Sequence, residues 1–303
     1  MSVASGHHRF DLGATWYWPN ERRVSALVDE LGLDVFAQHI DGDMMYEPNA
    51  SPQRVAGNQI DVPSGRFAEG AQSIPESLAK LLADDAVRLE EPVRSIRSAG
   101  DRLHVSADGS HWAASDVILA VPPATAVASI DIEGLDAAVR TVASATPVWM
   151  GATVKAVARY ERPFWRDAGL AGAAFSHVGP LREIHDMSGH DGMPAALFGF
   201  AQPDVDEPAP SRDAVLGQLE TLFGSPAGSP LELWIHDWRG EPFTVAPGTL
   251  KLSDYSTYGH PVYQRPSLAG RLHWASTETS PTAPGHIEGA LAAAERAAAA
   301  VLA

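Results

Sequence analysis

The polar turn at residues 276–279, which reads Ser-Thr-Glu-Thr, stands shortly before a long alanine-rich helical pattern. Pro284-Gly285 opens the helix, whose apolar positions are Ile287, Ala290, Leu291, Ala294, Ala298 and Val301. A helix N-terminus presents free backbone N–H groups and a partial positive charge. An anion, or a ring that becomes anionic on reduction, is therefore expected beyond Gly285. A helix that only closes a sheet, with its alanines packed against the strands, fits the spacing equally well.

Other groups that commonly do chemistry give weaker signals. The chain has twelve histidines, but the spacing of His177, His185 and His190 matches no metal-ligand motif. The chain has no cysteine, which excludes disulfides, thiolate metal sites and a thiol nucleophile. The Gly-x-Ser-x-Gly signature of hydrolases does not occur either. We therefore expect no metal site and no nucleophilic hydrolase.

The C-terminal segment resembles the flavin-binding signature of the flavin-containing amine oxidase family, in its compact bacterial form. A short strand at residues 271–275, the turn at 276–279 and the Gly-x-x-Glu-Gly-Ala helix start at 285–290 carry this resemblance, with Ser276 in place of the usual glycine. The resemblance implies FAD, bound non-covalently because no cysteine is available for a covalent link. The cofactor-binding residues that it implies here are Ser276, Thr277, Glu278, Gly285, His286 and Ile287.

The Asp-Leu-Gly-Ala-Thr-Trp stretch at residues 11–16 is a second match to the family. It precedes a helix with Val24, Leu27, Val28 and Leu31 on one face, closed by Gly32. In relatives this turn lies against the flavin ring, which implies contacts from Gly13, Ala14, Thr15 and Trp16. The resemblance adds Val93 beside the adenine and Trp238 near the flavin. A strand–turn–helix without a ligand, and a plain structural strand at Val93, remain alternatives.

Lys155 lies in a strand pattern that runs into Tyr-x-x-Pro-Phe-Trp at residues 160–165. A lone lysine in a strand usually points to solvent. The resemblance implies the opposite, a buried lysine that holds a water against flavin N5, and makes Lys155 the expected catalytic residue. The two aromatic residues that sandwich the amine in monoamine oxidases are not evident, because those places hold about Gly248 and His286. The substrate is therefore expected to differ from the usual arylalkylamine.

The expected elements follow the family's order, except at the start of the chain. The family begins with a βαβ unit whose Gly-x-Gly-x-x-Gly turn approaches the cofactor pyrophosphate. This chain contains no Gly-x-Gly at any position. A misplaced gene start, a trimmed chain and a lost unit are all consistent with that difference.

Local patterns predict the remaining elements. A helix follows residue 70, with Ser73 and Glu76 as a capping box and Leu78, Leu81 and Leu82 facing inward. Asp108-Gly109 predicts a hairpin, and Ser211 is an expected helix N-cap. A short excursion or hairpin is expected at 41–65. Strands are expected at residues 86–89, 93–96, 103–105, 117–121, 147–164, 182–187, 195–202 and 231–238.

Composition limits the classes of function. The chain has 303 residues, 45% of them hydrophobic, which is enough for two modest domains. Its formal net charge of −16 argues against binding to nucleic acid or to an anionic membrane surface. The sequence has no apolar run of about 18 residues and no apolar signal segment at its start. We therefore expect a cytoplasmic protein.

These observations predict an α/β protein with two interleaved domains. Residues 1–40, 65–146 and 262–303 are expected to form a Rossmann-like FAD-binding domain that lacks its first βαβ unit. Residues 41–64 and 147–261 are expected to form a substrate domain with a mixed or antiparallel sheet and helices. The implied reaction is oxidation of an amine C–N bond by FAD, with reoxidation by dioxygen. The alternatives are a flavin-less binding or scaffold protein and one chain of a split flavoenzyme. Self-association is expected, because a missing βαβ unit leaves strand edges and apolar surface uncovered.

Overall fold

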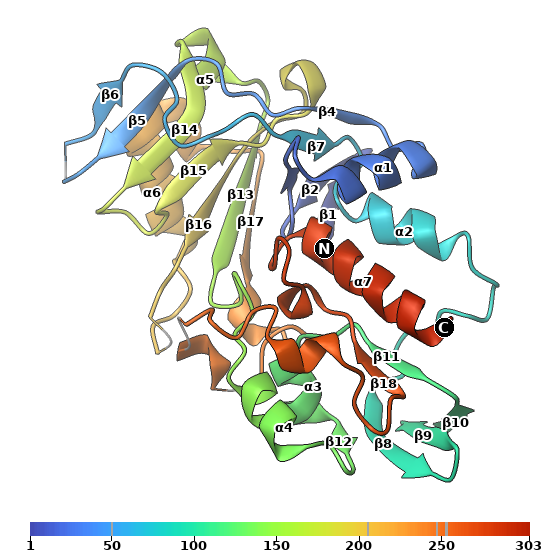
Figure 1. Ribbon diagram of the computed structural model, residues 1–303. Helices are drawn as coiled ribbons and strands as arrows, with labels where there is room; N and C mark the ends of the chain where they lie inside the picture. The colour runs from blue at the N-terminus through green and yellow to red at the C-terminus, as the bar shows by residue number, and fades with distance from the viewer. Residues whose placement is uncertain (50, 205, 247, 252–253) are drawn as a thin grey trace. The chain divides into compact units, whose positions relative to one another are not determined.

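The computed structural model describes residues 1–49, 51–204, 206–246, 248–251 and 254–303, and it has a mixed α/β fold (Figure 1). The chain forms two compact units. The first unit contains residues 1–21, 25–78 and 152–238, and the second contains residues 22–24, 79–151 and 239–303. These units reflect packing alone, so the boundaries of the functional domains stay a prediction.

The centre of the first unit is a seven-stranded sheet with the order β17-β13-β16-β15-β14-β5-β6 (Figure 1). Every pairing in it is antiparallel except that of β14 with β5. The predicted strands at 182–187, 195–202 and 231–238 correspond to three of its members, and the expected hairpin at 41–65 supplies two more. The bounds are β5 Asp43–Glu47, β6 Gln53–Val55, β13 Val154–Tyr160, β14 Leu170–Ser176, β15 Glu183–Asp186, β16 Ala195–Ala201 and β17 Glu232–Asp237.

The two faces of this sheet have different roles, because side chains alternate along each strand. On one face, Val154, Ala156 and Ala158 of β13 pack with Val215 and Leu219 of helix α6 (Arg212–Phe223). Burying each large aliphatic side chain contributes about 1.5–3 kcal/mol. The alternate residues of β13 therefore point to the opposite face of the sheet, and Lys155 is one of them.

Smaller elements complete the first unit. A three-stranded sheet has the order β3-β7-β4, and β1 pairs with β2. Helix α1 ends where predicted, because Gly32 adopts the left-handed conformation with φ 60°. Ser211 caps α6 as predicted, accepting a hydrogen bond from the amide of Ala214. The bounds are β1 Ser2–Ser5, β2 His8–Asp11, β3 Trp16–Tyr17, α1 Arg22–Leu31, β4 Val35–Ala37, β7 Gly65–Phe67, α2 Ser73–Ala79 and α5 Phe164–Asp167.

In its described residues, the second unit contains two sheets and three α-helices. A four-stranded sheet has the order β10-β9-β8-β12, with the predicted hairpin at Asp108-Gly109. Strands β11 and β18 form a two-stranded parallel sheet, and among the described strands β18 pairs with no other. The bounds are β8 Val93–Ala99, β9 Arg102–Ala107, β10 Ser110–Ala114, β11 Val117–Leu119, α3 Pro123–Ser129, β12 Asp131–Ile132, α4 Ala137–Ser144, β18 Leu272–Trp274 and α7 Ile287–Val301.

Three local predictions around helix α2 are wrong. Ser73 and Glu76 form no capping box, since the Glu76 amide donates to the Gln72 carbonyl oxygen and the Ser73 hydroxyl to that of Gly70. The Asp11 carboxylate instead accepts from the Ala71 amide ahead of the helix. Residues 86–89 form no strand. The expected inward-facing leucines are exposed, with exposed fractions of 37% for Leu78, 69% for Leu81 and 54% for Leu82.

The buried face of α7 also differs from the predicted one. Gly289, Ala293 and Ala297 are buried, whereas Ala294 and Ala298 are exposed. Alanine occupies most of the helix, so the sequence pattern indicates a helix but does not show which side of it is buried. In the described residues, no helix is both long and apolar enough to cross a membrane.

Candidate functional site

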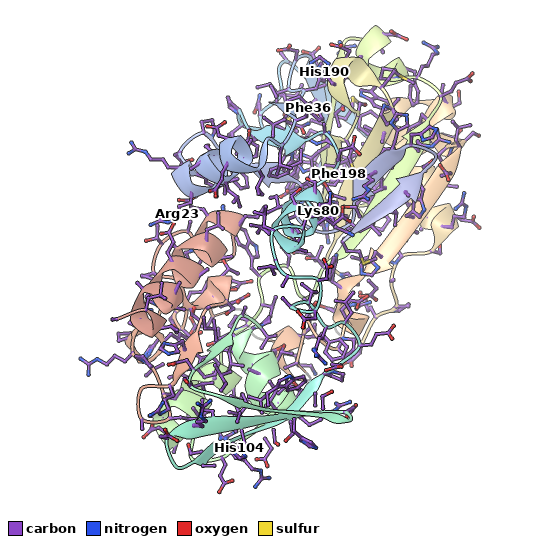
Figure 2. All side chains as sticks on the ribbon, turned by 90° about the vertical axis from the view of Figure 1, so that its right-hand side faces the viewer. Arg23, Phe36, Lys80, His104, His190 and Phe198 are labelled. Carbon is purple, nitrogen blue, oxygen red and sulfur yellow. The ribbon has the colours of Figure 1, made fainter. Side chains whose placement is uncertain are left out.

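Lys155 is buried in the first unit, with an exposed fraction of 1%. Its ammonium group donates to the Thr15 hydroxyl at 2.6 Å and to the Gly13 carbonyl oxygen at 3.1 Å. The same ammonium lies 4.3 Å from the ring centroid of Phe198, which Figure 2 labels. Two of the segments that carried the family resemblance, residues 11–16 and the lysine strand, are therefore in direct contact.

The surroundings of Lys155 bring its pKa close to neutral pH. Burial lowers the pKa of Lys155 to about 7, and the nearby charge of Asp11 opposes this change. Arg66 is also buried, and it lowers the pKa of Lys155 further. Burial raises the pKa of Asp11, although hydrogen bonding by Ser2 works against that shift. Lys155 is thus a group that can take or release a proton inside the protein.

An aromatic cluster surrounds the lysine on its face of the sheet. Lys155, Phe200 and Glu183 pair in register across β13, β16 and β15. Phe198 and His185 form the next row, with ring centroids 5.1 Å apart. Trp16 packs against this row, 5.2 Å from Phe198. Trp16 is therefore placed beside Lys155's aromatic neighbours.

The other first-unit residues implied by the resemblance occupy the same region. The Trp238 indole donates to the Leu12 carbonyl oxygen at 2.8 Å. A Cβ on Gly13 would lie 3.3 Å from the Trp238 ring, so glycine permits this close packing. Ala14 is exposed in the same turn. Gly13, Thr15, Trp16, Trp238 and Lys155 thus come together in one unit.

The second group of predicted residues lies in the second unit, where β18 leads into the turn at 276–279 and then α7. The Thr277 hydroxyl donates to the His286 carbonyl oxygen at 2.8 Å, tying the turn to the helix start. A Cβ on Gly289 would lie 2.2 Å from the Ala283 carbonyl oxygen, so this position requires glycine. The glycine of the Gly-x-x-Glu-Gly-Ala pattern therefore holds the turn and the helix together.

Glu288, the acidic residue of the same pattern, has a structural role. Its carboxylate accepts from the amides of Arg23 and Val24, the first-turn donors of α1. Arg23 also forms a salt bridge with it at 3.1 Å. Glu288 thus caps a helix from elsewhere in the chain, a role that its sequence position did not predict.

The buried polar atoms of this turn fit a bound cofactor. Ser276 and Glu278 are 5% and 3% exposed, and a hydrogen bond with the Ser276 hydroxyl opposes the rise that burial causes in the pKa of Glu278. His286 provides no side-chain cap for α7. Buried polar groups in proteins are normally hydrogen-bonded, and the Ser276 hydroxyl and the Glu278 carboxyl could also donate to or accept from a polar cofactor.

Trp149 lies directly over the start of this helix. Its ring is 5.0 Å from that of His286, and a Cβ on Gly285 would overlap it at 2.1 Å from Cε3. A ring bound beside Gly285 must therefore contact or displace Trp149. Ile287 is the first residue of α7 and follows directly.

Val93 stands apart from both groups. It is the first residue of β8 and packs on the core of the four-stranded sheet. Its predicted contact with adenine stays a prediction.

The structure also contains a group that the sequence did not indicate. His185 is buried and its Nδ1 lies 2.7 Å from the Asp61 carboxylate. Burial works against protonation, but hydrogen bonds with Asp61 and Glu183 outweigh it and raise the pKa of His185. Asp61 and His185 are far apart in sequence, so no local spacing could have found the pair.

Comparison with known proteins identifies the family. The family model for flavin-containing amine oxidoreductases matches residues 38–302. The chain belongs to this family. A putative flavin-containing monoamine oxidase of Mycobacterium tuberculosis is 34% identical over 254 residues, covering 80% of this chain and 54% of the relative. Putrescine oxidase of Kocuria rosea is 31% identical over 260 residues, covering 78% of this chain and 52% of the relative.

Solved structures of the family have the same fold. A putrescine oxidase structure with putrescine bound superposes with a TM-score of 0.84 at 20% identity, covering 100% of this chain and 90% of that one. Cyclohexylamine oxidase from Brevibacterium oxydans gives 0.83 at 18% identity, covering 99% and 90%. The chain spans about half the length of the curated relatives that it matches.

Proposed function

We propose that this chain is an FAD-dependent oxidoreductase that oxidises an amine C–N bond. A flavin bound here would supply hydride acceptance from the amine and reoxidation by dioxygen. The observation that carries the proposal is Lys155, a buried ammonium held by Gly13 and Thr15 in the turn that the family resemblance assigns to the flavin. A buried lysine with a pKa of about 7 suits proton exchange better than a purely structural role.

Separate groups of residues in the chain would handle the proton, bind the cofactor and contact the flavin ring. Lys155 orients a water or holds a proton at its Nζ atom. Ser276, Thr277 and Glu278 bind polar parts of the cofactor, and the N-terminus of α7 favours negative charge on it. Gly13, Ala14, Trp16 and Trp238 contact the flavin. His286, Ile287, Gly285 and Val93 complete the proposed cofactor contacts.

The experiment is anaerobic reduction of the flavin-loaded protein by a panel of primary and secondary amines. Loss of the oxidised flavin's visible absorbance, followed by its return and hydrogen peroxide formation on admitting dioxygen, is the expected result. A bound flavin that dithionite reduces but no amine reduces would contradict amine oxidation.

One observation favours a second candidate, a split flavoenzyme in which another chain supplies a dinucleotide-binding unit. Strands β11 and β18 form only a two-stranded parallel sheet among the described residues, although β18 has the burial of a central strand. Parallel sheets are rarely so small. Co-purification of a small partner that restores FAD binding would support this candidate over the first.

A further inference from the structure

Arg66 is a buried charged residue to which the proposed function gives no role. It is 6% exposed, and its guanidinium donates to the carbonyl oxygens of Ser188 at 2.8 Å and Met187 at 3.1 Å. Among the described residues, Arg66 Nε has no hydrogen-bond partner. Burial lowers the pKa of Arg66 to about 10, against the charges of Asp186 and Asp11, so the guanidinium stays charged at neutral pH. Arg66 is therefore a fixed positive charge inside the first unit.

The pairing of the small sheet places Arg66 next to the turn that holds Lys155. Arg66 of β7 lies opposite Trp16 of β3 and Phe36 of β4 in register. Side chains that are opposite in antiparallel strands share a face of the sheet, and the guanidinium carbon lies 5.1 Å from the ring centroid of Phe36, which Figure 2 labels. The residue before Trp16 is Thr15, whose hydroxyl accepts from Lys155. Arg66 and Lys155 therefore both lie against residues 15 and 16.

The titratable groups near Lys155 come from four neighbouring elements, β17, β15, β2 and β7. In that order they are His236, Glu183 and His185, Asp11, and Arg66. Burial has the largest effect on the pKa of Lys155, the charge of Asp11 raises it, and the charge of Arg66 lowers it. Because an arginine keeps its proton near neutral pH, the lysine is the cation that becomes neutral. A neutral amine can accept a hydrogen bond from water, whereas an ammonium only donates.

We propose that Arg66 is a positioning residue for the reaction at Lys155. Its fixed positive charge favours the neutral amine of Lys155, which can then accept a hydrogen bond from the water that it orients. Its hydrogen bonds to the carbonyl groups that follow β15 hold the small sheet, and with it Trp16, against the main sheet. This inference rests on the proposed function and adds to it a residue that no sequence pattern indicated.

The small number of lysines allows a direct test. The chain contains three of them, Lys80, Lys155 and Lys251. A ¹³C label at lysine Cε gives each one an NMR signal, and Lys155→Met removes and so assigns the signal of interest. The midpoint of its change with pH is the pKa of Lys155, and the flavin-free chain is sufficient for this measurement.

The test variant and its control differ in where the arginine charge lies. Arg66→Gln removes the charge and keeps a hydrogen-bond donor for the carbonyl groups. Arg159→Gln is the matched control, because Arg159 is on the same strand as Lys155 and its charge is paired with Glu232 at 2.6 Å. Both variants therefore lose one positive charge from the first unit, but only the first loses it beside the lysine turn.

The two charges that oppose each other at Lys155 predict shifts of opposite sign. Arg66→Gln should raise the NMR midpoint by about one pH unit, the usual effect of one close charge. Asp11→Asn should lower it by about the same amount, because it removes the opposing charge. Arg159→Gln should leave the midpoint unchanged. His236→Gln should also leave it unchanged, which would show that the lysine and not the imidazole titrates.

A second measurement connects the charge with the reaction. In the flavin-loaded protein, the rate of flavin reoxidation by dioxygen is measured against pH for wild type and Arg66→Gln. The midpoint of this profile should rise in the variant by the same amount as the NMR midpoint. An NMR shift without a matching shift of the rate profile would overturn the role of Arg66 in the reaction.

The remaining outcomes separate this inference from the proposed function. An unchanged Lys155 midpoint in Arg66→Gln, with only a lower melting temperature, would show that the arginine is purely structural and overturn the inference. If Arg66→Gln does not fold, an unchanged midpoint in Asp11→Asn would overturn it, because Lys155 would then not respond to the charges beside it. If no amine reduces the flavin, the proposed function fails and the role in the reaction fails with it, although the NMR shift would still be present.

Discussion

Lys155 and Glu278 are both buried ionisable side chains, one in each unit, and their surroundings differ in one respect. The Lys155 ammonium has protein partners in Gly13 and Thr15. Burial raises the pKa of Glu278, and a hydrogen bond with the Ser276 hydroxyl opposes that shift. The first group is fixed by hydrogen bonds between two distant segments of its unit, whereas the second lies in a short turn that is tied to the start of α7.

The largest expected effect concerns FAD affinity. The sequence has no Gly-x-Gly turn for the pyrophosphate, so residues 1–303 alone should bind FAD weakly. Fusing the dinucleotide-binding unit of a relative to residue 1 should tighten binding about 10²–10⁴-fold, since two or more charge-assisted hydrogen bonds are worth about 1.5–3 kcal/mol each. Flavin content after gel filtration measures both forms. A stoichiometric yellow flavin in the unfused protein would contradict this prediction.

Substitution of one glycine in each unit sharpens the comparison. Gly289→Ala introduces a Cβ that would lie 2.2 Å from the Ala283 carbonyl oxygen, and should lower the free energy of unfolding by about 1–3 kcal/mol and weaken flavin binding. Gly217→Ala in α6 is the matched control, because nothing lies within 4 Å of its added Cβ. That control should be neutral or stabilising by up to about 1 kcal/mol. Urea unfolding measures the stability of both variants. Equal stabilities would show that the backbone around Gly289 and Ala283 can accommodate a Cβ.

A smaller effect should appear in the pH dependence of stability. The pKa of Lys155 is about 7 in the folded protein against 10.5 for an ordinary lysine. Between these values the unfolded chain binds more protons, so this group makes stability rise as pH increases from about 7 to 10.5. Lys155→Met lacks the group and should lose that rise, which amounts to a few kcal/mol at about 1.4 kcal/mol per pKa unit.

The control for this measurement is Lys80→Met, since Lys80 is exposed at the end of α2 and is labelled in Figure 2. Urea unfolding across that pH range should give parallel curves for Lys80→Met and wild type. If the stability of Lys155→Met also changes with pH in parallel with that of wild type, the pKa of Lys155 is not lowered in the folded protein.

Local signals predicted those parts of the fold where one residue determines the backbone. Gly32 ended α1 and Ser211 began α6 because a left-handed stop and a side-chain cap are decided within a few residues. Leu81 and Leu82 were wrongly placed in the core, because a helical pattern cannot report whether anything packs on its apolar face. The face of α7 was misjudged because alanine occupies both sides.

The candidate site was predictable only in part. The family resemblance, not periodicity, indicated that Lys155 is buried, and its contact with Thr15 joins segments 140 residues apart. Glu288 matched the signature, but its capping of α1 depends on a distant helix. The Asp61–His185 pair escaped notice because it forms through a long-range contact, which no local spacing records.

The central claim is that Lys155 acts in amine oxidation, and stopped-flow kinetics of flavin-loaded Lys155→Met tests it most directly. This substitution keeps length and apolar bulk while removing the charge and its hydrogen-bond donors. Reoxidation by dioxygen after chemical reduction can be measured before a substrate is known. We expect flavin reduction by amine or reoxidation to slow at least about tenfold, since loss of one preorganised donor commonly costs that much or more, with flavin content unchanged. Wild-type rates in both half-reactions would contradict the claim.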